Sequence, residues 1–257
     1  MINSSGTDPN GERFEYLDSS LRKMNADIID EHYYRRPEWF LENAKRYDNY
    51  PRNGSKVFAG EYAAQSDKTV SVNNKNNWQT ALAEAAFMTG LERNADVVSM
   101  ASYAPLFAHA EGWQWTPDMI WVDNLRSYGT PNYYVQKLYS LNKGTNVVPM
   151  LMGNAAIAGQ DSLYATAAID KNSHELILKV VNASGKTVNK EIVIDGVKKL
   201  PSAGKLTVLK SDNLDKVNSF ANATAVSPVE QDITIKGKKV NMALAPYSFN
   251  IVRVKML

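Results

Sequence analysis

Glu61 is the first residue in this sequence whose position suggests chemistry. It follows the run KVFAG at residues 56–60, a short stretch of β-branched, aromatic and small side chains. Such a run is typical of a buried parallel strand, and the carboxylate falls at its carboxyl end. In an α/β barrel that end carries the loops that build the active site, so Glu61 is our first candidate for a catalytic group. The alternative is a strand-end carboxylate that caps the next helix or pairs with an arginine.

A second group of polar side chains, DEHYY at residues 30–34, leaves the strand that precedes the one bearing Glu61. Imidazole and phenol groups at that place can donate hydrogen bonds to a carboxylate on the next strand and hold it ionised and aimed. His32, Tyr33 and Tyr34 are therefore candidates for supporting Glu61 and contacting its substrate. For His32 a purely structural role is the alternative.

Aromatic side chains gather farther along the chain, in YAPLFAH at residues 103–109 and WQWTPD at residues 113–118. Aromatic faces with interspersed polar groups suit a sugar, which offers C–H faces for stacking and hydroxyls for hydrogen bonds. Trp115 and Asp118 are the candidates here. Alternatively, Trp113 and Trp115 cover the mouth of a barrel or meet a neighbouring domain.

The elements expected to position these residues change character near residue 150. Before it, helical and strand-like stretches alternate, which implies βαβ crossovers and a parallel sheet. The predicted strands are residues 26–30, 57–63 and 97–103, and the predicted helices are residues 37–50, 78–93 (Ala-rich and amphipathic) and 131–141.

After Pro149 short alternating runs are separated by turn residues, a pattern typical of an antiparallel β-sandwich. The predicted strands are residues 163–170, 175–182, 190–194, 204–209, 232–235 and 248–255. The fold class is therefore α/β plus all-β, with residues 1–148 as one domain and residues 149–257 as the other. Three βα units are too few to close an eight-stranded barrel, so the first domain is either an unusual small α/β layer or a partial (β/α)8 barrel.

The composition excludes several functions. A chain of 257 residues with 44% hydrophobic residues and a net charge of +2 has no basic stripe for nucleic acid. Cysteine is absent, and histidine occurs only at His32, His109 and His174, far apart, so we expect no metal site, disulfide or thiol nucleophile. No apolar run approaches the ~18 residues that span a bilayer, and the first residues carry no targeting signal, so we expect no membrane partner.

Several of these motifs, in order, resemble the α-L-arabinofuranosidases of glycoside hydrolase family 51. Residues 28–50, with DEHYY and PEWF, resemble the sixth barrel strand and helix of that family, and residues 57–63 resemble its seventh strand, which bears the nucleophile. The resemblance extends over nearly the whole chain, through VVSMASYAPL at 97–106, WTPD at 115–118 with Ile120 and Trp121, NSF at 218–220 and PYS at 246–248.

The resemblance implies a retaining glycosidase that removes terminal arabinofuranose from arabinan or arabinoxylan without a cofactor. Glu61 would attack the anomeric carbon, while a second carboxyl group about 5 Å away protonates the leaving oxygen and then activates water. Tyr34 is the best match to the family's tyrosine that contacts the nucleophile, with Tyr33 as the nearer alternative. Asp118 would contact a sugar hydroxyl.

The sequence departs from the family in one respect: the Asn-Glu pair that supplies the acid/base glutamate at the fourth strand has no counterpart at a strand end. We therefore expect a chain that begins after strand four or five, an incomplete site, and self-association through an exposed barrel edge. Glu31 is a poor substitute acid, because the resemblance places it beside the His-Tyr element with another role. The alternative function is a non-catalytic carbohydrate-binding or interaction module in which the sandwich is the working part.

Overall fold

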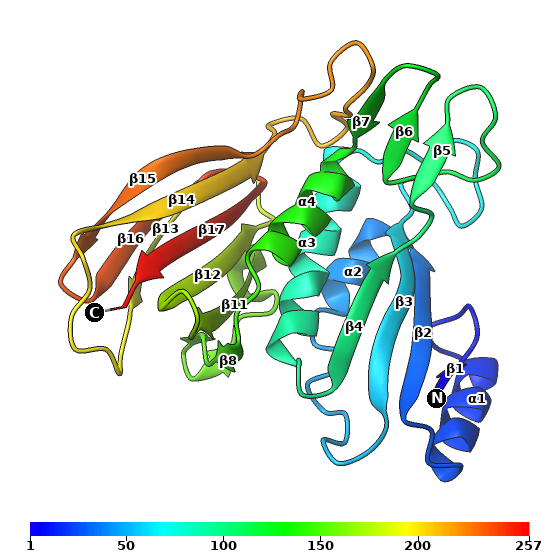
Figure 1. The fold of residues 1–257 in the computed structure, drawn as a ribbon, viewed down its shortest axis with the longest axis horizontal. Helices are drawn as coiled ribbons and strands as arrows, with labels where there is room; N and C mark the ends of the chain where they lie inside the picture. The colour runs from blue at the N-terminus through cyan, green and yellow to red at the C-terminus, as the bar shows by residue number, and fades with distance from the viewer. Residues whose placement is uncertain (257) are drawn as a thin grey trace.

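Four parallel strands form the sheet of the first half in the computed structural model, which describes residues 1–256 (Figure 1). Their order across the sheet is β1 (Ile2–Ser4), β2 (Ile28–Arg35), β3 (Lys56–Ala64) and β4 (Val98–Tyr103), and each neighbouring pair is parallel. The connecting helices are α1 (Glu12–Lys23), α2 (Pro37–Glu42) and α3 (Trp78–Arg93). The predicted parallel sheet is present, with one more strand than the sequence indicated.

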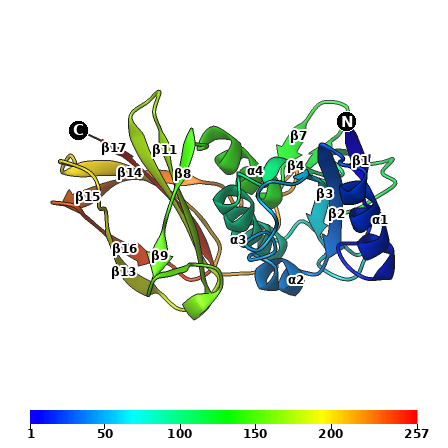
Figure 2. The ribbon, with the colours of Figure 1, turned by 90° about the horizontal axis from the view of Figure 1, so that it is seen from below.

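Helices α3 and α4 (Pro131–Leu141) lie between this sheet and the sheet of the second half (Figure 2). Asn77 caps α3 by accepting a hydrogen bond from the Thr80 amide, and Thr130 caps α4, which has proline at its first position. Every residue from Thr80 to Leu91 is buried. The predicted amphipathic helix is therefore apolar and enclosed on nearly all sides, because sheets cover it from two directions.

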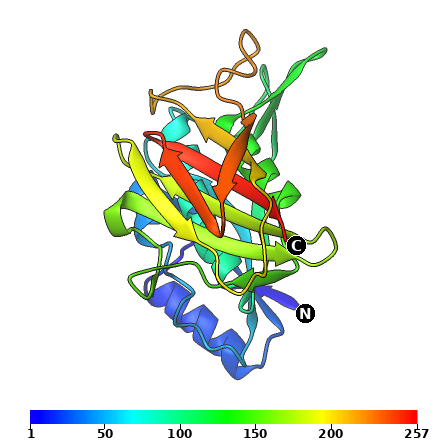
Figure 3. The same cartoon turned by 90° about the vertical axis from the view of Figure 1, so that its left-hand side faces the viewer.

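Eight antiparallel strands form the second sheet, in the order β13-β16-β15-β14-β17-β12-β11-β8. Their bounds are β8 Asn146–Val148, β11 Leu163–Asp170, β12 Glu175–Asn182, β13 Val188–Val193, β14 Ala203–Lys210, β15 Val229–Lys236, β16 Lys239–Leu244 and β17 Ser248–Lys255. The predicted sandwich is one continuous sheet that curls strongly on itself (Figure 3). Apolar side chains from β11, β12 and β17 meet those of β15 and β16 inside the curl.

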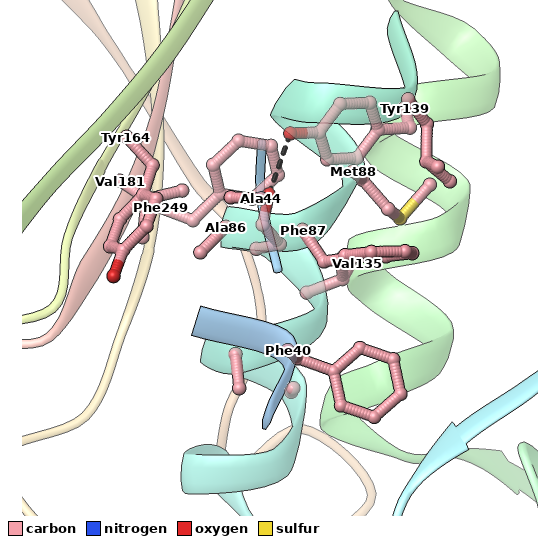
Figure 4. Close-up of a cluster of buried hydrophobic side chains, with 14 of the residues drawn as sticks. Phe40, Ala44, Ala86, Phe87, Met88, Val135, Tyr139, Tyr164, Val181 and Phe249 are labelled. Carbon is pink, nitrogen blue, oxygen red and sulfur yellow. Dashed lines mark hydrogen bonds between the residues drawn. The ribbon is translucent and has the colours of Figure 1, made fainter. Parts of the chain in front are cut away.

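Strands β12 and β17 are buried on both faces, since the face turned away from the curl packs on α3 and α4. Val181 and Phe249 join the helices in one hydrophobic cluster, in which Tyr139 stacks on Phe249 with ring centroids 5.2 Å apart (Figure 4). The large parallel sheet ends with β4 and the large antiparallel sheet begins with β8, whereas this buried cluster contains residues from both halves of the chain.

Small elements complete the described residues. A three-stranded sheet of β5 (Phe107–His109), β6 (Ile120–Val122) and β7 (Ser127–Gly129) projects beyond the end of β4, and β9 (Leu151–Met152) pairs with β10 (Ala155–Ala156) before the short 3-10 helix η1 (Gln160–Ser162). In residues 1–256 no helix has the combined length and apolar character needed to cross a membrane.

The structure differs from the sequence prediction at several elements. The helix expected over residues 37–50 ends at Glu42, and turns follow that bury Ala44 and Tyr47. The strand expected over residues 26–30 runs from Ile28 to Arg35, so DEHYY lies within it. Strands β1, β5 to β10 and β16 and helices α1 and η1 were not predicted. Strand β1 has only three residues, and α1 is a largely polar helix that buries only Leu21.

Candidate active site

Strand β2 presents two different sets of side chains, because successive residues point to opposite faces of a sheet. Glu31 and Tyr33 are fully buried, whereas the alternating residues Asp30, His32 and Tyr34 are only partly buried. The i, i+2 spacing therefore divides the DEHYY motif into a buried pair and a set of three on the other face.

The partly buried face of β2 meets Glu61 on β3. Strand register places His32 directly beside Glu61, with His32 Nδ1 3.5 Å from Glu61 Oε2. The Tyr34 hydroxyl donates a hydrogen bond to the same oxygen at 2.7 Å. The Glu61 side chain is 45% exposed, so the carboxylate is held on one side and open to solvent on the other.

Tyr34 is a neutral donor in this arrangement. Burial, and then the hydrogen bond and charge of Glu61, raise the pKa of the Tyr34 phenol well above its ordinary value of 10. The phenol therefore keeps its proton throughout the physiological range and donates it toward Glu61.

Tyr33, the alternative partner for Glu61, lies on the opposite face. Its hydroxyl donates to the buried Glu31 carboxylate at 2.6 Å, and Arg46 donates to the same carboxylate from Nε at 3.0 Å and from Nη2 at 2.9 Å. Tyr47 and Tyr50 also bond Glu31. Glu31 is thus a fully enclosed, paired carboxylate that faces away from Glu61.

Asp30 belongs to the same face as His32, and the sequence reasoning did not single it out. Its Oδ2 lies 2.9 Å from His32 Nε2. The i, i+2 spacing of Asp30, His32 and Tyr34 was the available signal, but it cannot show which of the two faces of a strand meets the carboxylate on the neighbouring strand.

The structure does not bring the third group of candidates into contact with Glu61. Trp115 is 50% exposed, in the segment between β5 and β6, and Asp118 is 2% exposed. Burial raises the pKa of Asp118 to about 6, and its Oδ2 has no hydrogen-bond partner within residues 1–256. No hydrogen bond or ion pair joins either side chain to Glu61 in this part of the chain.

A second buried carboxyl group lies behind β3. Glu84 on α3 is fully buried and accepts a hydrogen bond from the Ala64 amide at 2.9 Å. Burial raises its pKa to about 8. Among residues 1–256 no three histidine or carboxylate side chains converge as a metal site would require.

Fold and site together define a two-part protein: a parallel sheet with a partly exposed carboxylate in the carboxyl-terminal half of β3, joined through two helices to a curled antiparallel sheet. Residues 60–248 match the family model of the α-L-arabinofuranosidase C-terminal domain. The chain belongs to this family.

The curated relatives of this chain are also named as α-L-arabinofuranosidases. An extracellular exo-α-L-arabinofuranosidase of Streptomyces chartreusis is 50% identical over 149 residues, which cover 58% of this chain and 17% of the relative. α-L-Arabinofuranosidase 2 of Arabidopsis thaliana is 34% identical over 239 residues, which cover 91% of this chain and 34% of the relative. The chain therefore spans about a third or less of the length of these relatives.

Solved structures agree with this assignment. An arabinose-bound family 51 α-L-arabinofuranosidase aligns with a TM-score of 0.81 and 29% identity, over 95% of this chain and 42% of the other. The arabinose complex of the Thermotoga maritima α-L-arabinofuranosidase aligns with a TM-score of 0.75 over 99% of this chain and 57% of the other, at 16% identity, and so supports the fold alone.

Proposed function

We propose that this chain carries the nucleophile of a retaining α-L-arabinofuranosidase that acts on terminal arabinofuranosyl residues of arabinan or arabinoxylan. The observation that carries the proposal is Glu61 in the carboxyl-terminal half of β3, with Tyr34 hydrogen bonded to it at 2.7 Å and His32 beside it. Glu61 attacks the anomeric carbon and forms a glycosyl-enzyme, as the leaving oxygen departs. Tyr34 orients the carboxylate through this hydrogen bond, and the His32 ring lies beside it.

The architecture that we propose around this residue is the last part of a (β/α)8 barrel, followed by a β-sandwich domain that begins with β8 at Asn146, three residues before the boundary expected from the sequence. The parallel order β1-β2-β3-β4 supports it, as do the intervening helices and the placement of Glu61 in the carboxyl-terminal half of β3. In this arrangement Trp115 contacts the sugar from the segment after β4, whereas Asp118, at 2% exposure, is too enclosed to reach it. Tyr33 is left out of the sugar site, because it is enclosed on the opposite face.

The retaining mechanism needs a second carboxyl group about 5 Å from the nucleophile. We assign it to none of residues 1–256, because Glu31 faces away and Asp30 is paired with His32. A natural arabinan, whose leaving group needs a proton, is then a poor substrate for this chain alone, whereas an activated aryl arabinoside remains open to attack.

The test is incubation of the purified chain with 4-nitrophenyl α-L-arabinofuranoside, with nitrophenol release and the intact mass both measured. We expect a covalent pentosyl adduct or slow release of nitrophenol, and loss of both in Glu61→Gln. Glu38→Gln, an exposed carboxylate on α2, is the matched control. A folded wild-type sample that gives neither signal contradicts the proposal.

A binding module is the weaker candidate. The curled sheet encloses a cavity of about 730 Å³, but side chains such as Met150, Leu151 and Met152 make its lining largely apolar, which does not suit sugar hydroxyls.

Self-association is a further part of the proposal. Strand β4 lies at the edge of the parallel sheet, and Ser99, Met100, Ala101 and Ser102 are exposed along it. An open edge offers unpaired backbone groups to a second chain. We expect the apparent mass in light scattering to rise with concentration and to rise less for Met100→Lys; a monomer at every concentration contradicts this.

A further inference from the structure

Asp30 lies in the site, but the proposed reaction gives it no role. Its carboxylate lies on the same face of β2 as His32, and Oδ2 is 2.9 Å from His32 Nε2. Both side chains are largely enclosed, with 18% exposure for Asp30 and 13% for His32. Asp30 Oδ1 is buried without a hydrogen-bond partner among the described residues. The hydrogen bond of the Asp30 side chain is therefore the one to His32.

The backbone of β3 is shaped around this carboxylate. The register between β2 and β3 pairs Glu31 with Ala59 and His32 with Glu61, so Gly60 is the extra residue of a β-bulge. Bulges re-aim side chains and are frequent beside active sites. Here the bulge brings Glu61, rather than Gly60, beside His32.

Gly60 is also the residue against which Asp30 packs. A Cβ atom at position 60 would overlap Asp30 Oδ1, while the Gly60 backbone has no positive φ that would itself demand glycine. Glycine is therefore needed at this position for the space it leaves. Gly60 thus leaves room for the Asp30 carboxylate, which hydrogen bonds to the His32 imidazole beside Glu61.

The two nitrogens of an imidazole lie on different edges of the ring, so a hydrogen bond at one fixes where the other points. With Nε2 held by Asp30, Nδ1 faces Glu61 Oε2 at 3.5 Å. Since a carboxylate only accepts, Asp30 also requires that the proton of a neutral ring sit on Nε2, so the Nδ1 lone pair faces Glu61 and makes no hydrogen bond with it.

We propose that Asp30 is a positioning residue: its hydrogen bond to His32 Nε2 fixes the tautomer and the orientation of the imidazole ring that lies beside Glu61. This inference rests on the proposed function for its consequence, but the Asp30–His32 bond can be tested without any activity. Gly60 also belongs to this arrangement, because its lack of a side chain leaves the space that Asp30 occupies.

The first experiment is NMR of the ¹⁵N-histidine-labelled chain, whose three histidines allow the His32 signal to be assigned by its loss in His32→Gln. We expect wild-type His32 to carry its proton on Nε2, with a slowly exchanging resonance. Asp30→Asn and Gly60→Ala should remove or shift it. Asp27→Asn, an exposed aspartate before the same strand, should leave it unchanged. A His32 signal that is the same in Asp30→Asn and wild type overturns the inference.

The second experiment measures how fast 4-nitrophenyl α-L-arabinofuranoside labels Glu61, with thermal unfolding confirming that each variant is folded. Asp30→Asn should slow adduct formation roughly tenfold or more, as loss of an orienting partner does elsewhere, and Asp27→Asn should not. Equal rates for wild type and Asp30→Asn overturn the inference. If wild type forms no adduct, the proposed function fails, and the NMR result alone decides whether Asp30 positions His32.

Discussion

The Tyr34 hydroxyl lies 2.7 Å from Glu61 Oε2, although strand register sets Tyr34 beside Ala63 and sets Glu61 beside His32. The phenol ring therefore reaches back along the sheet by two positions, which a long, rigid side chain at the end of β2 permits. Tyr34 therefore hydrogen bonds to one oxygen of Glu61, while the other side of the carboxylate remains exposed to solvent.

Replacing Tyr34 with phenylalanine should slow adduct formation at Glu61 with little change in stability. A hydrogen bond to a charged group contributes about 1.5–3 kcal/mol, which corresponds to roughly a 10- to 100-fold loss of rate if the bond acts in the transition state. Pre-steady-state labelling followed by mass spectrometry measures this rate. Tyr16→Phe, on a residue that is 70% exposed, is the control. Equal rates for Tyr34→Phe and wild type would show that the phenol does not assist.

The interface between the second sheet and α3 contains a buried ion pair, and its disruption should lower the free energy of unfolding. Lys179 Nζ lies 2.6 Å from Glu92 Oε1, and the lysine side chain is fully buried. Burial lowers the pKa of Lys179, and the Glu92 charge opposes that shift. Glu92→Gln leaves the ammonium unpaired, and we expect a loss of about 3–5 kcal/mol in denaturant unfolding.

The control for this pair is an ion pair of similar length on the surface. Glu191 and Lys239 are 2.8 Å apart and about half exposed, so Glu191→Gln should cost at most about 1 kcal/mol. The double variant Glu92→Gln with Lys179→Met should recover much of the lost stability, because it removes the stranded charge. Similar losses for the buried and the surface variant would contradict the argument.

The raised pKa of Glu84 leads us to expect a stability that depends on pH. Because burial raises its pKa from the ordinary 4.5 to about 8, the folded chain holds a proton that the unfolded chain releases between these values. The free energy of unfolding should therefore fall as pH rises through this window, by up to about 1.4 kcal/mol per pH unit from this group, and level off above it. Urea unfolding at several pH values measures the slope.

Glu84→Gln mimics the protonated acid, so its stability relative to wild type should increase from pH 4.5 to 8 and then stay constant. Glu15→Gln, on the exposed side of α1, is the control and should give a difference that is small at every pH. If Glu84→Gln shows the same pH profile as wild type, Glu84 is ionised in the folded protein.

Gly90→Ala should destabilise the protein although alanine favours helix. Gly90 lies in α3 against the backbone carbonyl of Ala44, which an added Cβ would overlap. The gain in helix propensity is about 1 kcal/mol, whereas overpacking against a backbone typically costs about 1–3 kcal/mol. We expect a lower thermal midpoint than wild type. Gly112→Ala, where a Cβ meets open space, should be neutral, and a stabilised Gly90→Ala would refute the close contact.

Three strands of the second half, Leu163–Asp170, Glu175–Asn182 and Ser248–Lys255, have the bounds that the sequence predicted, as do the helices Trp78–Arg93 and Pro131–Leu141. Each carries its own signal in hydrophobic runs, caps and turn residues. Strand β16 has an alternating pattern that the sequence reasoning overlooked, and the helix after Pro37 ends early because Tyr47 turns inward to the Glu31 carboxylate.

The sequence by itself determined most of the longer elements and the place of Glu61 in the second half of a strand, because strand periodicity and turn chemistry act over a few residues. Only the tertiary structure decided which side chains of DEHYY share a face with Glu61. It separated Tyr34 and His32 from Tyr33, joined Asp30 to His32, and curled the antiparallel strands into one sheet. Register and the bulge at Gly60 set these relationships, and they arise from contacts between strands that lie far apart in the sequence.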